Sequence, residues 1–242
     1  MIVLFTDYGL NGPYLGEVEA VLFRYAPRER VINLIADVPR QNPRAGAYLL
    51  AACAHRFPAG TIFFCVVDPG VGSGEDKPVV IRSGDHRFVG PHNGLFDIIA
   101  RRGEKIECWE ISYRPEDTSA TFHGRDIYAP VCAMLANQQP VPGKKMDWRP
   151  RHDWPDDLNR IIYIDHFGNC MTGTRAAGVN PDAIIKAGGR EIKNAETFAS
   201  VKKGEAFWYE NSNGLLEIAV NHGSARERLD LDIGTEIFLE TI

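Results

Sequence analysis

The stretch that decides the fold is VVDPGVG at residues 66–72, where an apolar run breaks into a carboxylate on a tight turn. The run that leads into it, TIFFCVV at residues 61–67, is continuously apolar and rich in β-branched and aromatic residues. Such a run is typical of a strand buried on both faces, as in a parallel sheet. Pro69 fixes φ and Gly70 permits conformations closed to other residues, so we expect the chain to turn directly after Asp68.

This placement of Asp68 predicts a ligand site. Open α/β folds bind their ligands at the carboxyl edge of the sheet, and the turn delivers the Asp68 side chain there. The alternative is that Asp68 only caps its own turn through backbone hydrogen bonds. The loop by itself leaves both interpretations open.

Residues 1–140 alternate strand-like and helix-like segments around this run. The patterns predict strands at residues 1–5, 30–36, 61–67 and 78–81, and helices at residues 12–25, 45–56, 94–101 and 126–137. Alternation of this kind predicts an α/β domain with a doubly wound, mostly parallel sheet.

The character of the chain changes after this domain. Residues 141–157 are rich in proline and poor in apolar runs, which predicts a linker. Residues 158–242 form a second predicted domain, with short strands at residues 160–165, 183–187, 206–210, 215–220 and 236–240. Short strands separated by Gly and Asn turns indicate a small all-β barrel or sandwich.

Composition narrows the class of partner. The 242 residues are 44% hydrophobic and 24% charged, with a net charge of −5 and no basic cluster. We therefore expect no nucleic-acid or membrane partner. The first residues lack the basic start of a signal peptide, and the 5 cysteines are scattered in apolar runs. Both features favour a cytoplasmic protein without disulfides.

Two polar motifs of the first domain are candidate site segments. TDYG at residues 6–9 places Asp7 directly after the first strand, where a carboxylate suits a ribose diol or, equally, a turn. FHGRD at residues 122–126 places His123 beside a glycine, as either a site residue or a structural histidine. Asp126 is the predicted N-cap of the next helix, and Arg125 is expected to bind a phosphate or a structural carboxylate.

Two further motifs belong to the second domain. DHFGN at residues 165–169 supplies a carboxylate, an aromatic face and an amide. Asp165, Phe167 and Asn169 would suit a purine with a cationic substituent, and an Asx-type turn is the alternative. NSNG at residues 211–214 offers Ser212 and backbone amides to a carboxylate, or is simply a polar turn.

Together with PHNG at residues 91–94, these motifs resemble the S-adenosyl-L-methionine hydroxide adenosyltransferase family, which is related to fluorinase and chlorinase. The motifs follow the family's order and span nearly the whole chain. The resemblance implies an N-terminal α/β domain, a C-terminal β-barrel domain and a homotrimer. It also implies active sites between the N-terminal domain of one subunit and the C-terminal domain of its neighbour.

The reaction that the resemblance implies is hydrolysis of S-adenosyl-L-methionine to adenosine and L-methionine, with no cofactor and no metal. Asp68 and His123 would then orient and polarise a water in line with C5′ of the ribose. Asp7 would bind the ribose hydroxyls. In the C-terminal domain, Phe167 and Asn169 would bind the adenine. Asp165 would bind the ammonium of the methionine part, and Ser212 would bind its carboxylate.

One position departs from the family pattern. The family carries an Arg seven residues after the Asp that corresponds to Asp68, and here that position is Glu75. An acid cannot supply the positive fork of a guanidinium, so either Lys77 or Arg82 substitutes or turnover is weakened. A protein that binds adenosine or S-adenosyl-L-methionine with little turnover is therefore the main alternative. A halide-dependent synthase is disfavoured, because residues 81–94 leave no room for the extra loop of fluorinase.

Overall fold

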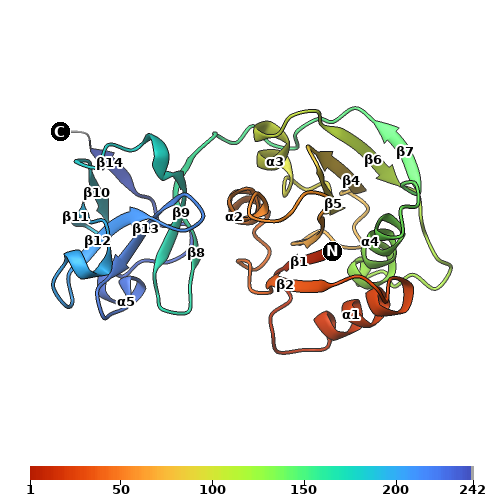
Figure 1. Cartoon of the computed structure of the whole chain (residues 1–242), viewed down its shortest axis with the longest axis horizontal. Helices are drawn as coiled ribbons and strands as arrows, with labels where there is room; N and C mark the ends of the chain where they lie inside the picture. The colour runs from red at the N-terminus through yellow and green to blue at the C-terminus, as the bar shows by residue number, and fades with distance from the viewer. Residues whose placement is uncertain (241–242) are drawn as a thin grey trace. The chain divides into compact units, whose positions relative to one another are not determined.

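The computed structural model of the protein describes residues 1–240 (Figure 1). The chain divides into two compact units: Met1–Leu50 with Phe57–Trp154, and Ala51–Arg56 with the chain from Pro155 onward. We call these the N-terminal and C-terminal units. The last two residues of the second predicted domain lie outside the described residues.

The N-terminal unit is built on a seven-stranded sheet with the order β2-β1-β3-β5-β4-β6-β7. The strands β2, β1, β3 and β5 run parallel to one another. The strands β4, β6 and β7 pair antiparallel with their neighbours. The strand bounds are Ile2–Thr6 for β1, Val31–Ile35 for β2, Ile62–Val66 for β3, Pro78–Ser83 for β4, His86–Pro91 for β5, Glu107–Ile111 for β6 and Gly143–Met146 for β7.

Helices cover both faces of this sheet (Figure 1). The helices α1 (Tyr14–Tyr25) and α4 (Ala129–Ala136) share one core with the strand residues Ile2 and Leu4. The helices α2 (Pro43–Ala54) and α3 (Asp97–Arg102) lie over the opposite face, where Phe5 contacts α2 near Gly46. The predicted α/β class and double winding are thus confirmed, with three antiparallel strands added beyond the parallel ones.

The structure corrects two local predictions in this unit. The predicted linker over residues 141–157 contains β7, which pairs with β6 from Gly143 opposite Ile111 to Met146 opposite Cys108. Prolines 140 and 142 precede this strand and so do not interrupt its hydrogen bonds.

The second correction concerns Asp126. It lies inside a π-helical turn, Gly124–Tyr128, that leads into α4, so the predicted N-cap role is wrong. Its carboxylate instead accepts hydrogen bonds from Ser119 N at 2.8 Å and Arg125 Nε at 2.6 Å. Arg125 also bonds Glu17 at 2.8 Å, so it holds structural carboxylates rather than a phosphate.

The C-terminal unit is a second seven-stranded sheet, with the order β14-β10-β11-β12-β13-β9-β8. Its strands are β8 (Leu158–Ile164), β9 (Cys170–Arg175), β10 (Ile184–Ala187), β11 (Arg190–Asn194), β12 (Ala206–Glu210), β13 (Leu215–Val220) and β14 (Phe238–Glu240). Short helices add α5 (Ala225–Leu229) and the 3-10 turns Ala176–Gly178 and Phe198–Ser200.

This second sheet curls back on itself, as the predicted barrel requires. Ile161 N, in the first strand β8, donates to Thr235 O at 3.0 Å, and Ile237 N donates to Asn159 O at 3.0 Å. These bonds join β8 to the segment that leads into the last strand, β14. A cluster of apolar side chains, including Ile185, Trp208 and Ile218, fills the interior. Within residues 1–240, no helix is long and apolar enough to cross a membrane.

Candidate active site

Asp7 and Asp68 leave the same edge of the N-terminal sheet. Thr6, the last residue of β1, lies opposite Val66, the last residue of β3. The chain therefore presents Asp7 one residue after β1 and Asp68 two residues after β3. Asp7 Oδ2 accepts a hydrogen bond from Gln41 N at 2.9 Å, and burial raises the pKa of the Asp7 carboxyl above its usual range.

Asp68 caps its own turn and also has a raised pKa. Its Oδ1 accepts a hydrogen bond from Gly70 N at 3.1 Å, so the turn-capping interpretation is correct as far as it goes. Burial raises the pKa of the same carboxyl to about 6, and the negative charges of Asp76 and Asp7 also raise it. A carboxylate with a pKa near neutrality is well placed to accept a proton at physiological pH.

Asp76 is a site neighbour that the sequence pattern did not single out. A Cβ added to Gly70 would lie 3.0 Å from Asp76 Oδ2 and 3.7 Å from Asp68 Oδ1. The two carboxylates therefore lie close to the glycine, and a side chain at this position would require the Asp76 carboxylate to shift by a few tenths of an ångström. Arg151 Nη2 lies 3.8 Å from Asp76 Oδ1 and places a guanidinium on this side of the loop.

The segment that carries His123 packs against both aspartate loops. A Cβ on Gly124 would meet Tyr8 Oη at 2.0 Å, and a Cβ on Gly72 would meet Ala120 O at 2.5 Å. Three of the predicted motifs thus converge at one edge of the sheet. Burial and the positive charge of Arg114 lower the pKa of His123, which keeps its imidazole neutral at pH 7.

The cations expected to replace the family Arg are occupied elsewhere. Lys77 Nζ pairs with Glu110 Oε2 at 2.7 Å, and Arg82 pairs with Glu107. Both acids belong to β6, so both cations serve the pairing of β4 with β6. Other guanidiniums lie near the candidate site: the charge of Arg114 acts on His123, that of Arg40 acts on Asp7, and Arg151 lies 3.8 Å from Asp76.

The motif at residues 91–94 supports the end of β3. Asn93 Nδ2 donates to Val67 O at 2.8 Å, and Asn93 Oδ1 accepts from Leu95 N at 3.3 Å. Asn93 is buried, so these bonds satisfy an amide that has little access to water. The motif therefore braces the Asp68 loop from behind, while His92 Nε2 lies 2.9 Å from Arg149 O.

The C-terminal unit contains a pocket of about 770 Å³. It brings together all of the residues predicted in this unit: Asp165, Phe167, Asn169 and Ser212. The Phe167 side chain is 74% exposed, which leaves an aromatic face open to a ligand. The acidic lining residues are Asp165 and Glu217, and no Lys or Arg of residues 1–240 lines this pocket. A ligand with a positive charge suits such a lining.

Asp165 organises the first wall of this pocket. Its Oδ1 accepts hydrogen bonds from Phe167 N and Asn169 N, both at 2.9 Å, and its Oδ2 accepts from Asn169 Nδ2 at 3.0 Å. The Asx-type turn considered as the alternative is therefore present. It also fixes the residues that carry the aromatic and amide groups, so the turn and site interpretations are compatible.

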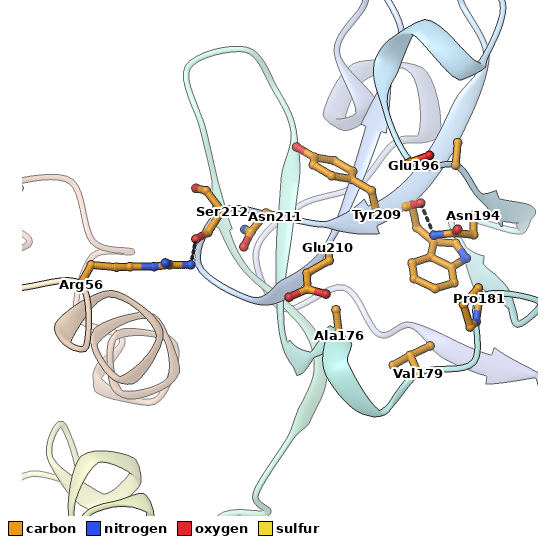
Figure 2. Close-up of a pocket in the computed structure, with 12 residues that line it drawn as sticks. Arg56, Ala176, Val179, Pro181, Asn194, Glu196, Tyr209, Glu210, Asn211 and Ser212 are labelled. Carbon is orange, nitrogen blue, oxygen red and sulfur yellow. Dashed lines mark hydrogen bonds between the residues drawn. The ribbon is translucent and has the colours of Figure 1, made fainter.

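A buried carboxylate that the sequence analysis missed forms the second wall. Glu217 is 2% exposed, and its carboxylate accepts hydrogen bonds from Tyr209 Oη and, at 2.7 Å, from Asn211 Nδ2. Figure 2 shows Tyr209 on β12, followed by the turn with Asn211 and Ser212, in a neighbouring pocket of about 510 Å³ that these residues also line. The available signal was a single acid inside LLEIAV, the apolar strand at residues 215–220.

The described residues 1–240 contain no group of three or more His, Cys, Asp or Glu side chains arranged to hold a metal ion.

The fold defines a two-domain protein with an α/β unit and a β-barrel unit, each of which carries a group of polar candidate site residues. The chain belongs to the SAM hydroxide adenosyltransferase family, whose N-terminal domain matches residues 2–144 and whose C-terminal domain matches residues 159–238. It is 35% identical to the (R)-S-adenosyl-L-methionine hydrolase of Thermus thermophilus, with 98% of each chain covered. It is 33% identical to the hydrolase of the same name from Salinispora tropica, with 96% of this chain and 94% of that protein covered.

Solved structures agree over the whole chain. The structure of an uncharacterized conserved protein from Thermotoga maritima superposes with a TM-score of 0.91 at 31% identity and covers 100% of both chains. A conserved hypothetical protein from Thermus thermophilus superposes with a TM-score of 0.78 at 32% identity and covers 99% of both chains.

Proposed function

We propose that this protein hydrolyses S-adenosyl-L-methionine to adenosine and L-methionine. The observation that carries the proposal is its full-length similarity to proteins named as (R)-S-adenosyl-L-methionine hydrolases, at 35% and 33% identity. The protein is thus an enzyme rather than a binding protein with little turnover, because relatives at this similarity are named for the reaction itself.

The C-terminal pocket supports the substrate assignment. Phe167 stacks on the adenine, and Asn169 bonds its edge. Asp165 pairs with the ammonium of the methionine part, and Ser212 with nearby backbone amides binds the carboxylate. The acidic lining also matches the net positive charge that the sulfonium adds to the substrate.

The N-terminal residues provide the ribose contacts and the water. Asp7 accepts hydrogen bonds from the ribose hydroxyls. Asp68 and neutral His123 hold a water in line with C5′, and the water oxygen attacks that carbon. The C5′–S bond breaks and its electron pair stays on sulfur, which yields neutral methionine thioether. The proton lost by the water passes to Asp68, whose pKa of about 6 suits an acceptor at neutral pH.

The decisive experiment is incubation of the purified protein with S-adenosyl-L-methionine and chromatographic measurement of adenosine and methionine. We expect both products in equal amounts. Asp68→Asn is the matched inactive control, because asparagine preserves the turn while it removes the charge. No adenosine above the uncatalysed rate at any pH between 5 and 9 would contradict the proposal, and a gain of activity in Glu75→Arg would then favour the binding-protein alternative.

We also propose a homotrimer in which each site combines N-terminal residues of one subunit with C-terminal residues of its neighbour. Light scattering should give three times the 27.0 kDa mass of the chain. Co-expression of Asp68→Asn with a Phe167→Ser, Ser212→Ala chain should restore activity, since some mixed sites then contain two intact halves. Sites formed within one subunit would give no recovery.

A cytoplasmic location is a further part of the proposal. The cysteines Cys53, Cys65, Cys108, Cys132 and Cys170 are all free and buried. Free buried cysteines suit a reducing compartment. Fractionation of cells that express the tagged protein tests this directly.

A further inference from the structure

We propose that Glu217 is a positioning residue that fixes the Ser212 turn for the carboxylate end of the substrate. This inference rests on the proposed function and extends it to a residue that touches no reacting atom. Glu217 lies on β13 directly opposite Tyr209 of β12, so the antiparallel pairing delivers both side chains to the same pocket.

The contacts of Glu217 lead to the turn through one side chain. The Glu217 carboxylate accepts from Asn211 Nδ2 at 2.7 Å. Asn211 Oδ1 in turn accepts from Asn213 N at 2.9 Å and Leu215 N at 3.0 Å. Because Asn211 must point its amide nitrogen at Glu217, its oxygen faces the backbone of the turn. The acid therefore sets the orientation of the amide that closes the turn around Ser212.

The burial of this network indicates a purpose other than stability. Glu217 and Asn211 are 2% and 7% exposed, while the neighbouring Glu210 is exposed. A buried carboxylate is costly even when it is hydrogen bonded, and apolar replacements of such groups are often neutral or stabilising. Burial raises the pKa of Glu217, in keeping with that cost. Retention of an acid here is explained by the shape that it imposes on the ligand-binding turn.

The test compares ligands with and without the methionine part. Glu217→Gln replaces one of the two carboxylate oxygens with an NH2 group. In one of the two orientations of the glutamine amide, this NH2 group faces the Asn211 amide nitrogen, so two hydrogen-bond donors oppose each other. We expect the KM for S-adenosyl-L-methionine to rise about 10-fold with kcat changed less than about twofold, as for lost ground-state positioning. Calorimetry should show adenosine binding changed less than about twofold, because adenosine has no carboxylate for the turn to hold.

Two further variants make the result specific. Glu210→Gln alters the exposed acid beside the same turn. It should change neither the KM for S-adenosyl-L-methionine nor the binding of adenosine. Tyr209→Phe removes only the hydroxyl that bonds Glu217 and leaves Asn211 in place, so it should raise the KM less than Glu217→Gln does. The double variant Glu217→Gln, Asn211→Ala should be no worse than the weaker-binding single variant, since both act through one chain of bonds.

The possible outcomes separate this inference from the proposed function. A wild-type protein that releases no adenosine refutes the function itself. An active wild type with an unchanged KM in Glu217→Gln refutes only the positioning role. Equal weakening of S-adenosyl-L-methionine and adenosine would show general disruption of the pocket and would also overturn the inference.

Discussion

Thr6 of β1 and Val66 of β3 lie opposite each other in the parallel sheet. Because the strands end in register, the acids that follow them emerge together, and Asp7 N donates to Val66 O at 3.4 Å. The negative charge of Asp7 then adds to burial and to the charge of Asp76 in raising the pKa of Asp68. The register of one strand pair thus contributes to the electrostatic environment of the candidate active site.

The first prediction concerns the rate. Asp68→Asn should lower the single-turnover rate by about two to four orders of magnitude, the scale of a lost acid–base group. Substrate affinity should stay nearly unchanged. The wild-type rate should rise with pH and level off above about 6, because only the ionised carboxyl accepts a proton. Rapid-quench measurements across pH test both statements, and an unchanged rate in the variant would leave Asp68 as a turn residue only.

The second prediction concerns stability, which should change with pH in the opposite direction to the rate. The pKa of Asp68 is raised in the folded protein from its ordinary 3.8 to about 6, so its stabilising contribution is complete below pH 4 and is lost as pH rises through 6. Asp68→Asn should therefore stabilise the fold at pH 7.5 by about 1–2 kcal/mol, after allowance for partial solvent access. Urea unfolding at pH 7.5 and pH 4 measures the difference. A gain that persists at pH 4 would contradict this explanation.

The third prediction separates binding from chemistry. Asp7→Ala should weaken substrate and adenosine binding by about 1.5–3 kcal/mol, since it removes charge-assisted hydrogen bonds to the ribose. The rate at saturating substrate should change far less than in Asp68→Asn. Dissociation constants and single-turnover rates of the two variants provide the comparison. An unfolding curve serves as the control, because Asp7 also accepts a bond from Gln41 N.

The fourth prediction uses two glycines of one loop. Gly72 has a φ of +81° and Gly74 a φ of +78°, so alanine is strained at both positions. Only at Gly72 does the new Cβ also meet a backbone atom, Ala120 O at 2.5 Å. Gly74→Ala should cost about 1 kcal/mol, and Gly72→Ala about 1–3 kcal/mol more. The free energy of unfolding decides the matter, and equal losses would show that the two loops do not pack tightly.

The fifth prediction concerns an exposed aromatic side chain. Phe167→Ala should weaken adenosine binding about 2- to 10-fold, the range for one lost stacking contact. Its stability should hardly change, because Phe167 is 74% exposed. Phe238→Ala is the matched control, since Phe238 is 60% exposed in the same unit but does not line the pocket. Titration calorimetry on both variants suffices, and equal effects would argue against a stacking role.

The sequence predicted best those strands whose side chains are mostly apolar. The predicted ranges 206–210 and 215–220 coincide with β12 and β13. By contrast β9 was missed, because its threonines and glycine resemble a turn. Thr172 and Thr174 are nevertheless buried, and their hydroxyls donate to the backbone oxygens of Leu216 and Leu158 at 2.8 Å and 3.1 Å. Such bonds depend on neighbouring strands and leave no local signal.

In the candidate site too, only features that depend on local sequence were predictable. The positions of Asp7 and Asp68 at one edge of the sheet were predictable because each comes within two residues of the end of an apolar strand. Glu217 was not, because its meaning depends on Tyr209 across the strand pair and on Asn211 beyond it. The ion pair of Lys77 was not predictable for a related reason, since its partner Glu110 lies on a strand that the pattern did not reveal.

The short strand β7 has a consequence for behaviour at high concentration. It ends the strand order of the N-terminal sheet and carries two exposed cations, Lys144 and Lys145. Lys145 is held by Glu107 at 2.6 Å and lies over the ring of Trp109, 5.8 Å from its centroid. A second molecule that added a strand here would have to bury or displace these charges. The segment that the sequence suggested was only a connection therefore carries charges that disfavour pairing of two sheets edge to edge.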